Sequence, residues 1–172
     1  GVAYAGDILN RFGEAFNAAL EGWDPVSWAQ LFRRSGARYV VLVTKHHDGF
    51  VLWPSDVENP NKAGWQATRD VVGELADAVR AEGLKFGVYY SGGVDWTFKH
   101  KRIESFADFM VSMPGEAEGY TAYANAHYDE LIERYQPDYL WNDIAYPSAQ
   151  ASFDILAKYY NTVPEGLTND RW

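Results

Sequence analysis

A carboxylate, an indole and a phenol come together in the short stretch of residues 139–143, whose sequence is YLWND. The stretch follows Pro137-Asp138, a pair that ends a helix and starts an extended segment. Side chains alternate across a strand, so Tyr139, Trp141 and Asp143 share one face. An unpaired carboxylate is costly in a plain core. It suits a sugar site, where the indole packs on a pyranose ring and the carboxylate faces the positive charge that develops at the anomeric carbon.

The same aspartate has a second interpretation, as the N-cap of a helix expected to begin near Ser148. Asp is common at such positions because its side chain accepts hydrogen bonds from the first free backbone N–H groups of a helix. The residue types alone leave both roles of Asp143 open.

A pair of histidines closes the first expected strand, in the sequence KHHDGF at residues 45–50. Adjacent strand residues point to opposite faces, so His46 and His47 are a poor chelate for one ion, and zinc needs three or four ligands. We therefore expect neither a metal site nor a cofactor. Beyond its last hydrogen-bonded residue the strand can twist, which would let both rings reach one polyol. The alternative is a structural pair that holds the loop.

The elements that must position these residues alternate along the chain. Capping residues, apolar spacing and glycine stops predict helices over 24–36, 69–82, 120–135 and 148–161. Strands are expected at 39–43, 85–90, 139–143 and 167–168. The first two strands are apolar throughout, as in strands that a parallel sheet buries on both faces. Alternation of this kind predicts an α/β fold with parallel strands, whereas residues 1–10 show no clear periodicity.

Polar residues gather after the carboxyl ends of the expected strands, which is the face that carries active sites in (β/α) barrels. About four strands are expected, whereas a complete barrel has eight and typically ~250 residues. We therefore expect a partial (β/α)8 TIM-type barrel with about four parallel strands and flanking helices, in which residues 1–172 form one domain. No glycine-rich phosphate fingerprint follows a strand, which argues against a dinucleotide-binding fold.

Composition narrows the classes of partner. The 172 residues suffice for one domain with a substantial core. No apolar run is long enough to span a bilayer and the chain has no signal-like start, so we expect a soluble protein. A net charge of −9 argues against nucleic acid and membranes as partners. There is no cysteine, so disulfides and thiolate metal sites are excluded. The 7 Trp and 12 Tyr suit a carbohydrate binder.

Four motifs appear in order along the chain: KHHDGF followed by LWPS, then GVYYSGGVDW, YQPDYLWND and TNDRW. Together they resemble the α-L-fucosidases of glycoside hydrolase family 29, in that family's order and spacing and over nearly the whole chain. One motif alone would be weak, whereas four in order are specific. The resemblance implies a (β/α) barrel and a retaining, exo-acting hydrolase of α-linked L-fucose.

The resemblance also implies roles for single residues. Asp143 matches the family's nucleophile, and Trp141 matches an aromatic wall of the pocket. The other positions that match fucose-binding residues are His46, His47, Tyr89 and Arg171. In the family the acid/base carboxylate lies beyond the NDRW segment, and a further fucose-binding His precedes the part matched by Gly1, so we expect no residue here to take either role. Five other carboxylates are interpreted as solvated loop charges: Asp48, Asp95, Glu116, Glu118 and Asp170.

The leading hypothesis is a retaining α-L-fucosidase that hydrolyses terminal α-linked L-fucose through a covalent fucosyl-enzyme on Asp143. One alternative is a fucose-binding, catalytically impaired fragment without the acid/base residue, and another is a structural half that acts only when joined to a partner chain. About four strands cannot close on themselves, so strand edges and one apolar face stay uncovered. We therefore expect self-association into a homo-oligomer, because exposed apolar patches tend to become interfaces.

Overall fold

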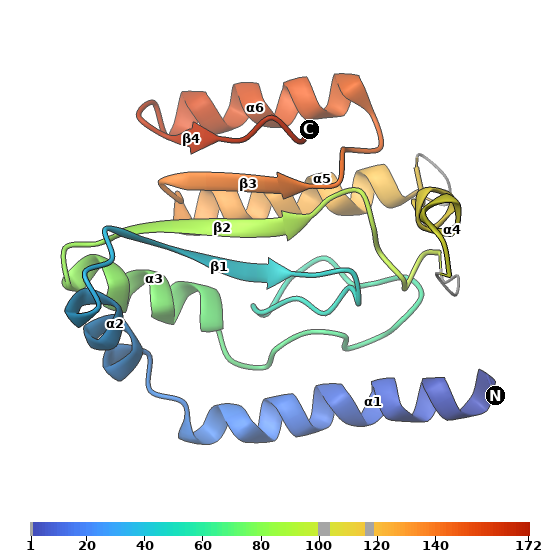
Figure 1. Cartoon of the computed structure of the whole chain (residues 1–172), viewed down its shortest axis with the longest axis horizontal. Coiled ribbons are helices and arrows are strands. Elements are labelled where there is room, and N and C mark those ends of the chain that lie inside the picture. The colour runs from blue at the N-terminus through green and yellow to red at the C-terminus, as the bar shows by residue number, and fades with distance from the viewer. Residues whose placement is uncertain (1, 100–103, 116–118) are drawn as a thin grey trace.

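The computed structural model describes residues 2–99, 104–115 and 119–172, with side chains from residue 11 onward. Four strands form one parallel sheet, in which spatial order and chain order are the same (Figure 1). The strands are β1 (Tyr39–Lys45), β2 (Lys85–Ser91), β3 (Tyr139–Asp143) and β4 (Leu167–Thr168). Parallel neighbours need helical crossovers, and the sheet with its flanking helices confirms the expected α/β class.

The four expected helices begin and end close to the predicted residues. They are α2 (Pro25–Arg34), α3 (Val71–Ala81), α5 (Tyr120–Glu130) with the π-helical turn η3 (Leu131–Tyr135), and α6 (Ala149–Thr162). Side-chain caps fix three of the starts, because Asp24, Asp70 and Ser148 accept hydrogen bonds from backbone N–H groups at 3.0, 2.9 and 3.4 Å. The last of these caps matters for the site, since it is Ser148 and not Asp143 that starts α6.

Helix α1 (Val2–Ala19), continued by the short turn η1 (Leu20–Gly22), was not expected. It lies apart from the sheet, beside the loop that follows β1 (Figure 1). Asn17 donates to the carbonyl of Gln66 at 3.2 Å, and a Cβ on Gly13 would lie 3.1 Å from the Trp65 ring. Gly13, which weakens a helix in isolation, therefore allows the close approach of an indole. The short helix α4 (Phe106–Val111) also lies where only a loop was expected.

The apolar spacing that predicts α2 comes from Trp28, Leu31 and Phe32, and most of this stripe is exposed. Trp28 and Leu31 are 48% and 56% exposed, whereas Ala29 is fully buried. Helix α2 packs against α3, and a small residue such as alanine lets two helices approach closely. The apolar spacing identified the helix correctly but not the side chain that contacts its neighbour.

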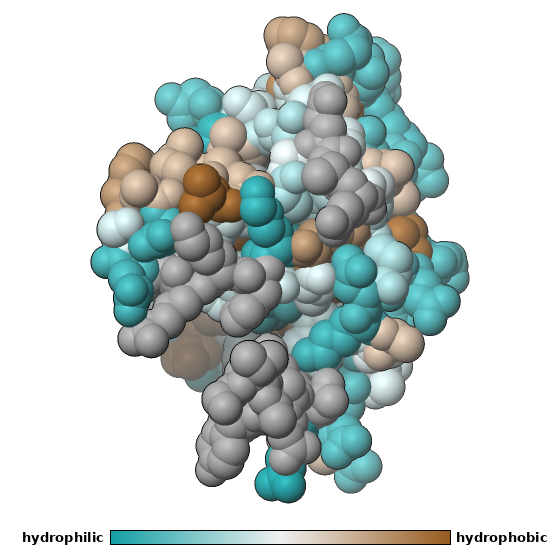
Figure 2. All heavy atoms as spheres, turned by 90° about the vertical axis from the view of Figure 1, so that its right-hand side faces the viewer, coloured by the Kyte–Doolittle hydropathy of each residue, from teal (hydrophilic) through white to brown (hydrophobic). Residues whose placement is uncertain are grey.

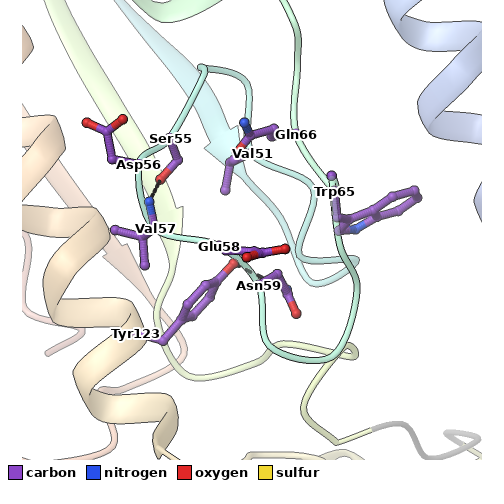
Figure 3. A pocket seen from close by; sticks show the side chains of 10 residues that line it. Val51, Ser55, Asp56, Val57, Glu58, Asn59, Trp65, Gln66 and Tyr123 are labelled. Atoms are coloured by element: carbon purple, nitrogen blue, oxygen red, sulfur yellow. Dashed lines mark hydrogen bonds between the residues drawn. The ribbon is translucent and has the colours of Figure 1, made fainter.

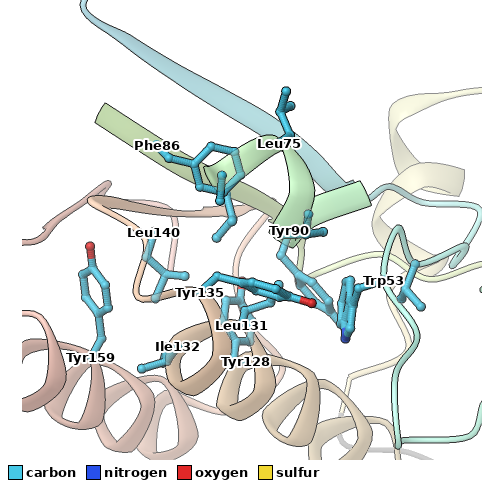
Figure 4. Packing of buried hydrophobic residues seen from close by; sticks show 14 of the residues in the cluster. Trp53, Leu75, Phe86, Tyr90, Tyr128, Leu131, Ile132, Tyr135, Leu140 and Tyr159 are labelled. Atoms are coloured by element: carbon cyan, nitrogen blue, oxygen red, sulfur yellow. The ribbon is translucent and has the colours of Figure 1, made fainter. Parts of the chain in front are cut away.

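The core lies between the sheet and the helices (Figure 4). Alternate residues of β2 and β3 point into it, so Phe86, Tyr90 and Leu140 are fully buried. From the helices, Leu131 and Tyr159 complete the packing. The alternation expected from a strand period of two residues is confirmed in both strands. In β2, Tyr89 is only partly covered between buried Val88 and Tyr90, and in β3, Leu140 and Asn142 are buried while their neighbours are only partly covered.

The register between β1 and β2 shifts by one residue near the end of β1. Val43 pairs with Tyr89, whereas Lys45 pairs with Tyr90. An extra residue in one strand changes which face the following side chains point to. The shift places Lys45 in the fully buried layer that contains Tyr90, and it makes His46 the next residue on the opposite side.

The other face of the sheet is open, which confirms the expectation that about four strands leave one apolar face uncovered. Strand β1 is therefore not buried on both faces, as its apolar run alone had indicated. Tyr39 and Val43 are 63% and 44% exposed, and Leu167 on β4 is 66% exposed. All described helices that contact the strands cover the opposite face.

Within the described part of the chain no helix is long and apolar enough to cross a membrane.

Two phenylalanines test where the core lies. Phe86 is fully buried between sheet and helices, and Phe153 is 66% exposed on α6. Phe86→Ala should lower the free energy of unfolding by about 3–5 kcal/mol, because it removes buried area and leaves a cavity. Phe153→Ala, the matched control, should change it by less than about 0.5 kcal/mol. Denaturant unfolding measures both values, and equal effects would contradict the placement of the core.

Candidate active site at the carboxyl ends of the strands

Asp143 is the last residue of β3, and two side chains hold its carboxylate. The hydroxyl of Tyr89 donates to Oδ2 at 2.6 Å, and the Arg171 guanidinium donates to Oδ1 at 2.7 Å. Tyr89 comes from β2 and Arg171 from the segment after β4, so three parts of the chain meet at one carboxylate. The Asp143 side chain is 14% exposed. The helix-cap interpretation is therefore wrong, and the carboxylate is available on the open face of the sheet.

The surroundings keep this carboxylate ionised. Partial burial raises the pKa of Asp143, but the hydrogen bonds from Tyr89 and Arg171 outweigh it, and the pKa lies below its usual value. For Tyr89, burial and then the bond to Asp143 raise the pKa of the phenol well above its usual value. Tyr89 thus remains a donor at neutral pH, and Asp143 remains an acceptor with a full negative charge.

The two histidine rings lie on the same side, beside Tyr89. The centroids of His46 and His47 are 4.0 Å apart, and the His46 ring is stacked on Tyr89 at 5.8 Å with 11° between the planes. Plain alternation would separate the two rings. Strand β1 ends at Lys45, so both histidines lie beyond it and are free of this restriction, as expected for a chain that can twist past the strand end.

One hydrogen-bond chain defines the tautomer of His47. Its Nδ1 lies 2.7 Å from Ser91 Oγ, and the Ser91 hydroxyl donates its proton to the carbonyl of Val94 at 2.9 Å. Ser91 Oγ therefore accepts from Nδ1–H, which leaves Nε2 with a free lone pair. Burial and then the neighbouring His46 lower the pKa of His47 to about 4. The ring is thus a neutral acceptor at physiological pH.

A buried ion pair lies directly behind the histidines. Lys45 Nζ is 2.9 Å from Asp95 Oδ2, and both side chains are completely buried. The ammonium also donates to the carbonyl of Ser91 at 2.9 Å, and Asp95 Oδ1 accepts from the backbone and hydroxyl of Thr97. The interpretation of Asp95 as a solvated loop charge is wrong. The sequence signal was Lys45 itself, a charged residue that ends an apolar strand.

The pair joins the loops that follow β1 and β2. The backbone N–H of Trp96 donates to the carbonyl of His47 at 2.7 Å. Gly49 has φ +77°, and a Cβ there would lie 2.7 Å from Asp95 Oδ1. A side chain at Gly49 would therefore displace the carboxylate that pairs with Lys45.

The loop after Asp143 has an unusual backbone. Ile144 and Ala145 have φ values of +62° and +64°, in the left-handed region that L-residues rarely adopt. Gly93 lies against this turn, and a Cβ on it would overlap the carbonyl of Ile144. The Gly93 N–H donates to the carbonyl of Asp143 at 3.1 Å. The glycines after β2 thus permit a close backbone contact with the end of β3.

Trp141 lies on the same face of β3 as Asp143, with its ring 6.4 Å from Tyr89 and 5.5 Å from Tyr139. Among the described residues, its indole nitrogen has no hydrogen-bond partner. All six residues expected at the site are therefore linked by contacts: Trp141, Tyr89, His46, His47, Asp143 and Arg171. The resemblance did not identify Lys45, Asp95, Ser91 or Asn142 as supports of this cluster.

Two other acidic residues lie beside the cluster in the chain, because Asp48 follows His47 and Asp170 precedes Arg171. Asp170 is exposed and Asp48 accepts from the backbone of Phe50 at 2.7 Å, while Glu116 and Glu118 lie outside the described residues. Figure 2 shows the side toward which the strands point, where hydrophilic residues surround separate hydrophobic patches. In the described part of the chain, no group of three or more His, Asp or Glu side chains is arranged to hold a metal ion.

A cavity of about 240 Å³ lies elsewhere, between the loop after β1 and helix α5 (Figure 3). Asn59, one of its polar lining residues, is bonded within the protein, because it donates to Thr97 and to Tyr123 and accepts from the backbone of Asn61. Ser55 likewise donates to Glu130 at 2.6 Å. The cavity shares no lining residue with the Asp143 cluster.

Comparisons with known proteins agree with this geometry. A family model described as Alpha-L-fucosidase matches residues 4–172. The chain is 36% identical to the tissue alpha-L-fucosidase of Bos taurus over 94% of its length and 34% of that protein. It is 38% identical to the human plasma alpha-L-fucosidase over 94% of its length and 34% of that protein. It therefore spans about a third of the length of these curated relatives.

Solved structures extend the comparison to the fold. The crystal structure of Thermotoga maritima alpha-fucosidase in complex with fucose matches with a TM-score of 0.84 and 44% identity, over 94% of this chain and 38% of that one. Alpha-L-fucosidase isoenzyme 1 from Paenibacillus thiaminolyticus matches with a TM-score of 0.68 and 30% identity, over 87% of this chain and 38% of that one.

The buried ion pair gives a test of how the site is supported. Lys45→Met should lower the free energy of unfolding by about 3–5 kcal/mol, because it leaves the Asp95 carboxylate buried and uncompensated. Adding Asp95→Leu should recover much of that loss. The control is Lys85→Met, whose pair with Asp138 involves a lysine side chain that is 73% exposed, and it should cost less than about 1 kcal/mol. Denaturant unfolding of the three variants and the unmodified protein measures the difference, and equal losses in Lys45→Met and Lys85→Met would refute a buried pair.

Proposed function

This chain belongs to the α-L-fucosidase family, and from that premise we propose that it carries the nucleophile and most of the sugar-binding residues of a retaining α-L-fucosidase. The observation that supports the proposal most directly is the Asp143 carboxylate, held between the Tyr89 hydroxyl and the Arg171 guanidinium on the open face of the sheet. The rings of His46 and His47 and the indole of Trp141 lie around it. This set combines one ionised nucleophile with several neutral hydrogen-bonding groups, as an uncharged sugar requires.

In the proposed first step, an oxygen of Asp143 attacks the anomeric carbon of terminal α-linked L-fucose. The bond from that carbon to the aglycone oxygen breaks, and the leaving oxygen takes a proton from an acid/base carboxyl group. The product is a covalent fucosyl-enzyme. In the second step the acid/base group deprotonates water, which attacks the same carbon and frees Asp143. Tyr89 and Arg171 hold the carboxylate in place and keep it charged, so no proton has to leave Asp143 before the attack.

The other residues fit the three ring hydroxyls and the methyl group of fucose. His47 offers a lone pair on Nε2, because its Nδ1–H is used by Ser91. His46 is exposed beside it and provides a second hydrogen-bonding ring. The indole of Trp141 supplies an apolar surface for a sugar face. Arg171 is both a partner of Asp143 and, with its side chain 57% exposed, a donor to the substrate.

We place the acid/base carboxylate outside this segment, because in the family it lies beyond the part that matches NDRW. We propose that residues 1–172 form one portion of a (β/α)8 catalytic barrel. The apolar residues Tyr39, Val43 and Leu167 on the open face are the side chains that further strands of such a barrel would cover.

The open face predicts self-association when the 172 residues are prepared alone. Burying exposed apolar side chains is favourable, and a second copy is then the available cover, so a homo-oligomer should form. Sedimentation at micromolar concentration measures this. A single compact species of 19.5 kDa would contradict self-association. Tyr39→Lys, which places a charge on the open face, should shift the distribution toward monomer.

Asp143→Asn tests the nucleophile. In the protein that carries this chain, the variant should lose activity on an aryl α-L-fucoside by a factor on the order of 10⁴ or more, because an amide cannot form the glycosyl ester. An aryl leaving group needs little protonation, so the assay reports on the nucleophile rather than on the acid. The control is Asp154→Asn on the exposed surface of α6, which should keep full turnover. Retained fucose binding with no turnover in the unmodified protein would instead favour a binding fragment.

A further inference from the structure

Asn142 lies next to Asp143 but points to the other side of the sheet. It is completely buried, and every hydrogen-bonding group of its side chain has a partner. Oδ1 accepts from the Tyr128 hydroxyl at 2.8 Å, while Nδ2 donates to the carbonyls of Ala145 at 2.9 Å and Arg171 at 2.6 Å. A buried amide with all its partners satisfied is a rigid connector.

The two carbonyls that Asn142 binds belong to the turn that follows Asp143 and to the segment that carries Arg171. Ala145 ends the left-handed turn that begins after Asp143. That conformation is unfavourable for L-residues, so the turn needs bonds from outside to hold it. Arg171 is the residue whose guanidinium pairs with the Asp143 carboxylate. One side chain therefore fixes the backbone on both sides of the Asp143–Arg171 contact.

We infer that Asn142 is a positioning residue for this reaction. It holds the Arg171 segment and the turn after Asp143 so that the guanidinium and the carboxylate stay within hydrogen-bond distance. The inference rests on the proposed function of Asp143. Asn142 is on the opposite side of the strand from the substrate face, so it acts through Arg171 and not by contact with the sugar.

The chemistry of the amide explains why asparagine occupies this position. Two carbonyls need two N–H donors from one nitrogen, and one phenol needs one acceptor. Asp would keep the acceptor and lose both donors, and Leu would lose all three bonds. The backbone of Asn142 is held separately, because Asn169 accepts from its N–H at 3.2 Å and donates to its carbonyl at 2.8 Å. Removing the side-chain amide should thus leave the pairing around β3 in place.

A double-mutant cycle separates positioning from general stability. In the protein that carries this chain, kcat/KM on an aryl α-L-fucoside is measured for Asn142→Ala, Arg171→Ala and the double variant. Asn142→Ala alone should lower kcat/KM about tenfold or more, and in the Arg171→Ala background it should lower it less than about threefold, since residues that act through one contact are not additive. Equal losses in both backgrounds, with circular dichroism unchanged, would overturn the inference.

The pH profile is a second readout. The groups that face Asp143 are Tyr89 from β2, His47 from the loop after β1 and Arg171, whose own neighbour is Asp170. Arg171 lowers the pKa of Asp143, so loosening it should move the acid limb of kcat/KM to higher pH, as Arg171→Ala should also do. An acid limb that does not move in a folded Asn142→Ala protein would count against the inference.

Two further variants complete the design. Tyr128→Phe removes only the bond to Asn142 Oδ1 and should leave kcat/KM and its pH profile nearly unchanged. If Asn142→Ala does not fold, Asn142→Asp keeps the side-chain shape, loses both donated bonds and should show the same loss. Full activity of folded Asn142→Asp would overturn the inference. Failure of the proposed function is distinct, because Asp143→Asn would then retain turnover.

Discussion

The buried pair of Lys45 and Asp95 is the constraint on which the rest of the site depends. Two full charges without solvent are tolerated only when their geometry is fixed and their remaining groups are bonded, and here they are. Because Lys45 belongs to the end of β1 and Asp95 to the loop after β2, the pair sets the distance between these two chain segments. The His47–Ser91 bond and the contact of the Trp96 N–H with the His47 carbonyl both lie between them. The two histidine rings can therefore lie beside Tyr89 because a charged pair is enclosed behind them.

The local features could be predicted from the sequence because their causes are local. The caps at Asp24, Asp70 and Ser148 depend on one side chain and a backbone N–H nearby. The parity of β2 and β3 follows from a period of two residues, and it placed Tyr89, Trp141 and Asp143 on the open face. Four ordered motifs indicated which residues come together, because each motif contains the end of a strand and parallel strands bring their carboxyl ends to one edge.

The features that were missed depend on contacts between distant segments. No local rule indicates that Asp95 is buried, because its partner lies fifty residues away at Lys45. The register shift in β1 is visible only when β2 lies beside it. Helix α1 packs on the loop after β1, where Phe12 and Phe16 contact the ring of Phe50, and this contact needs no continuous apolar stripe. The left-handed conformation of Ile144 is unfavourable by itself. The close approach of Gly93 and the bond from Asn142 to the carbonyl of Ala145 explain why it is adopted.

The strand ends share one arrangement that explains how a sheet can support chemistry on one face. At the end of β1 the buried Lys45 is followed by His46, and at the end of β3 the buried Asn142 is followed by Asp143. In each case a fully bonded polar residue anchors the loop from the helix side, and the next residue presents its side chain on the open face. Alternation along the strand links the two roles. Because an anchored backbone leaves the following side chain little freedom, the cost of ordering the site is met when the chain folds and not when a sugar binds. The polar residues that never contact substrate are thus as much a part of the site as those that do.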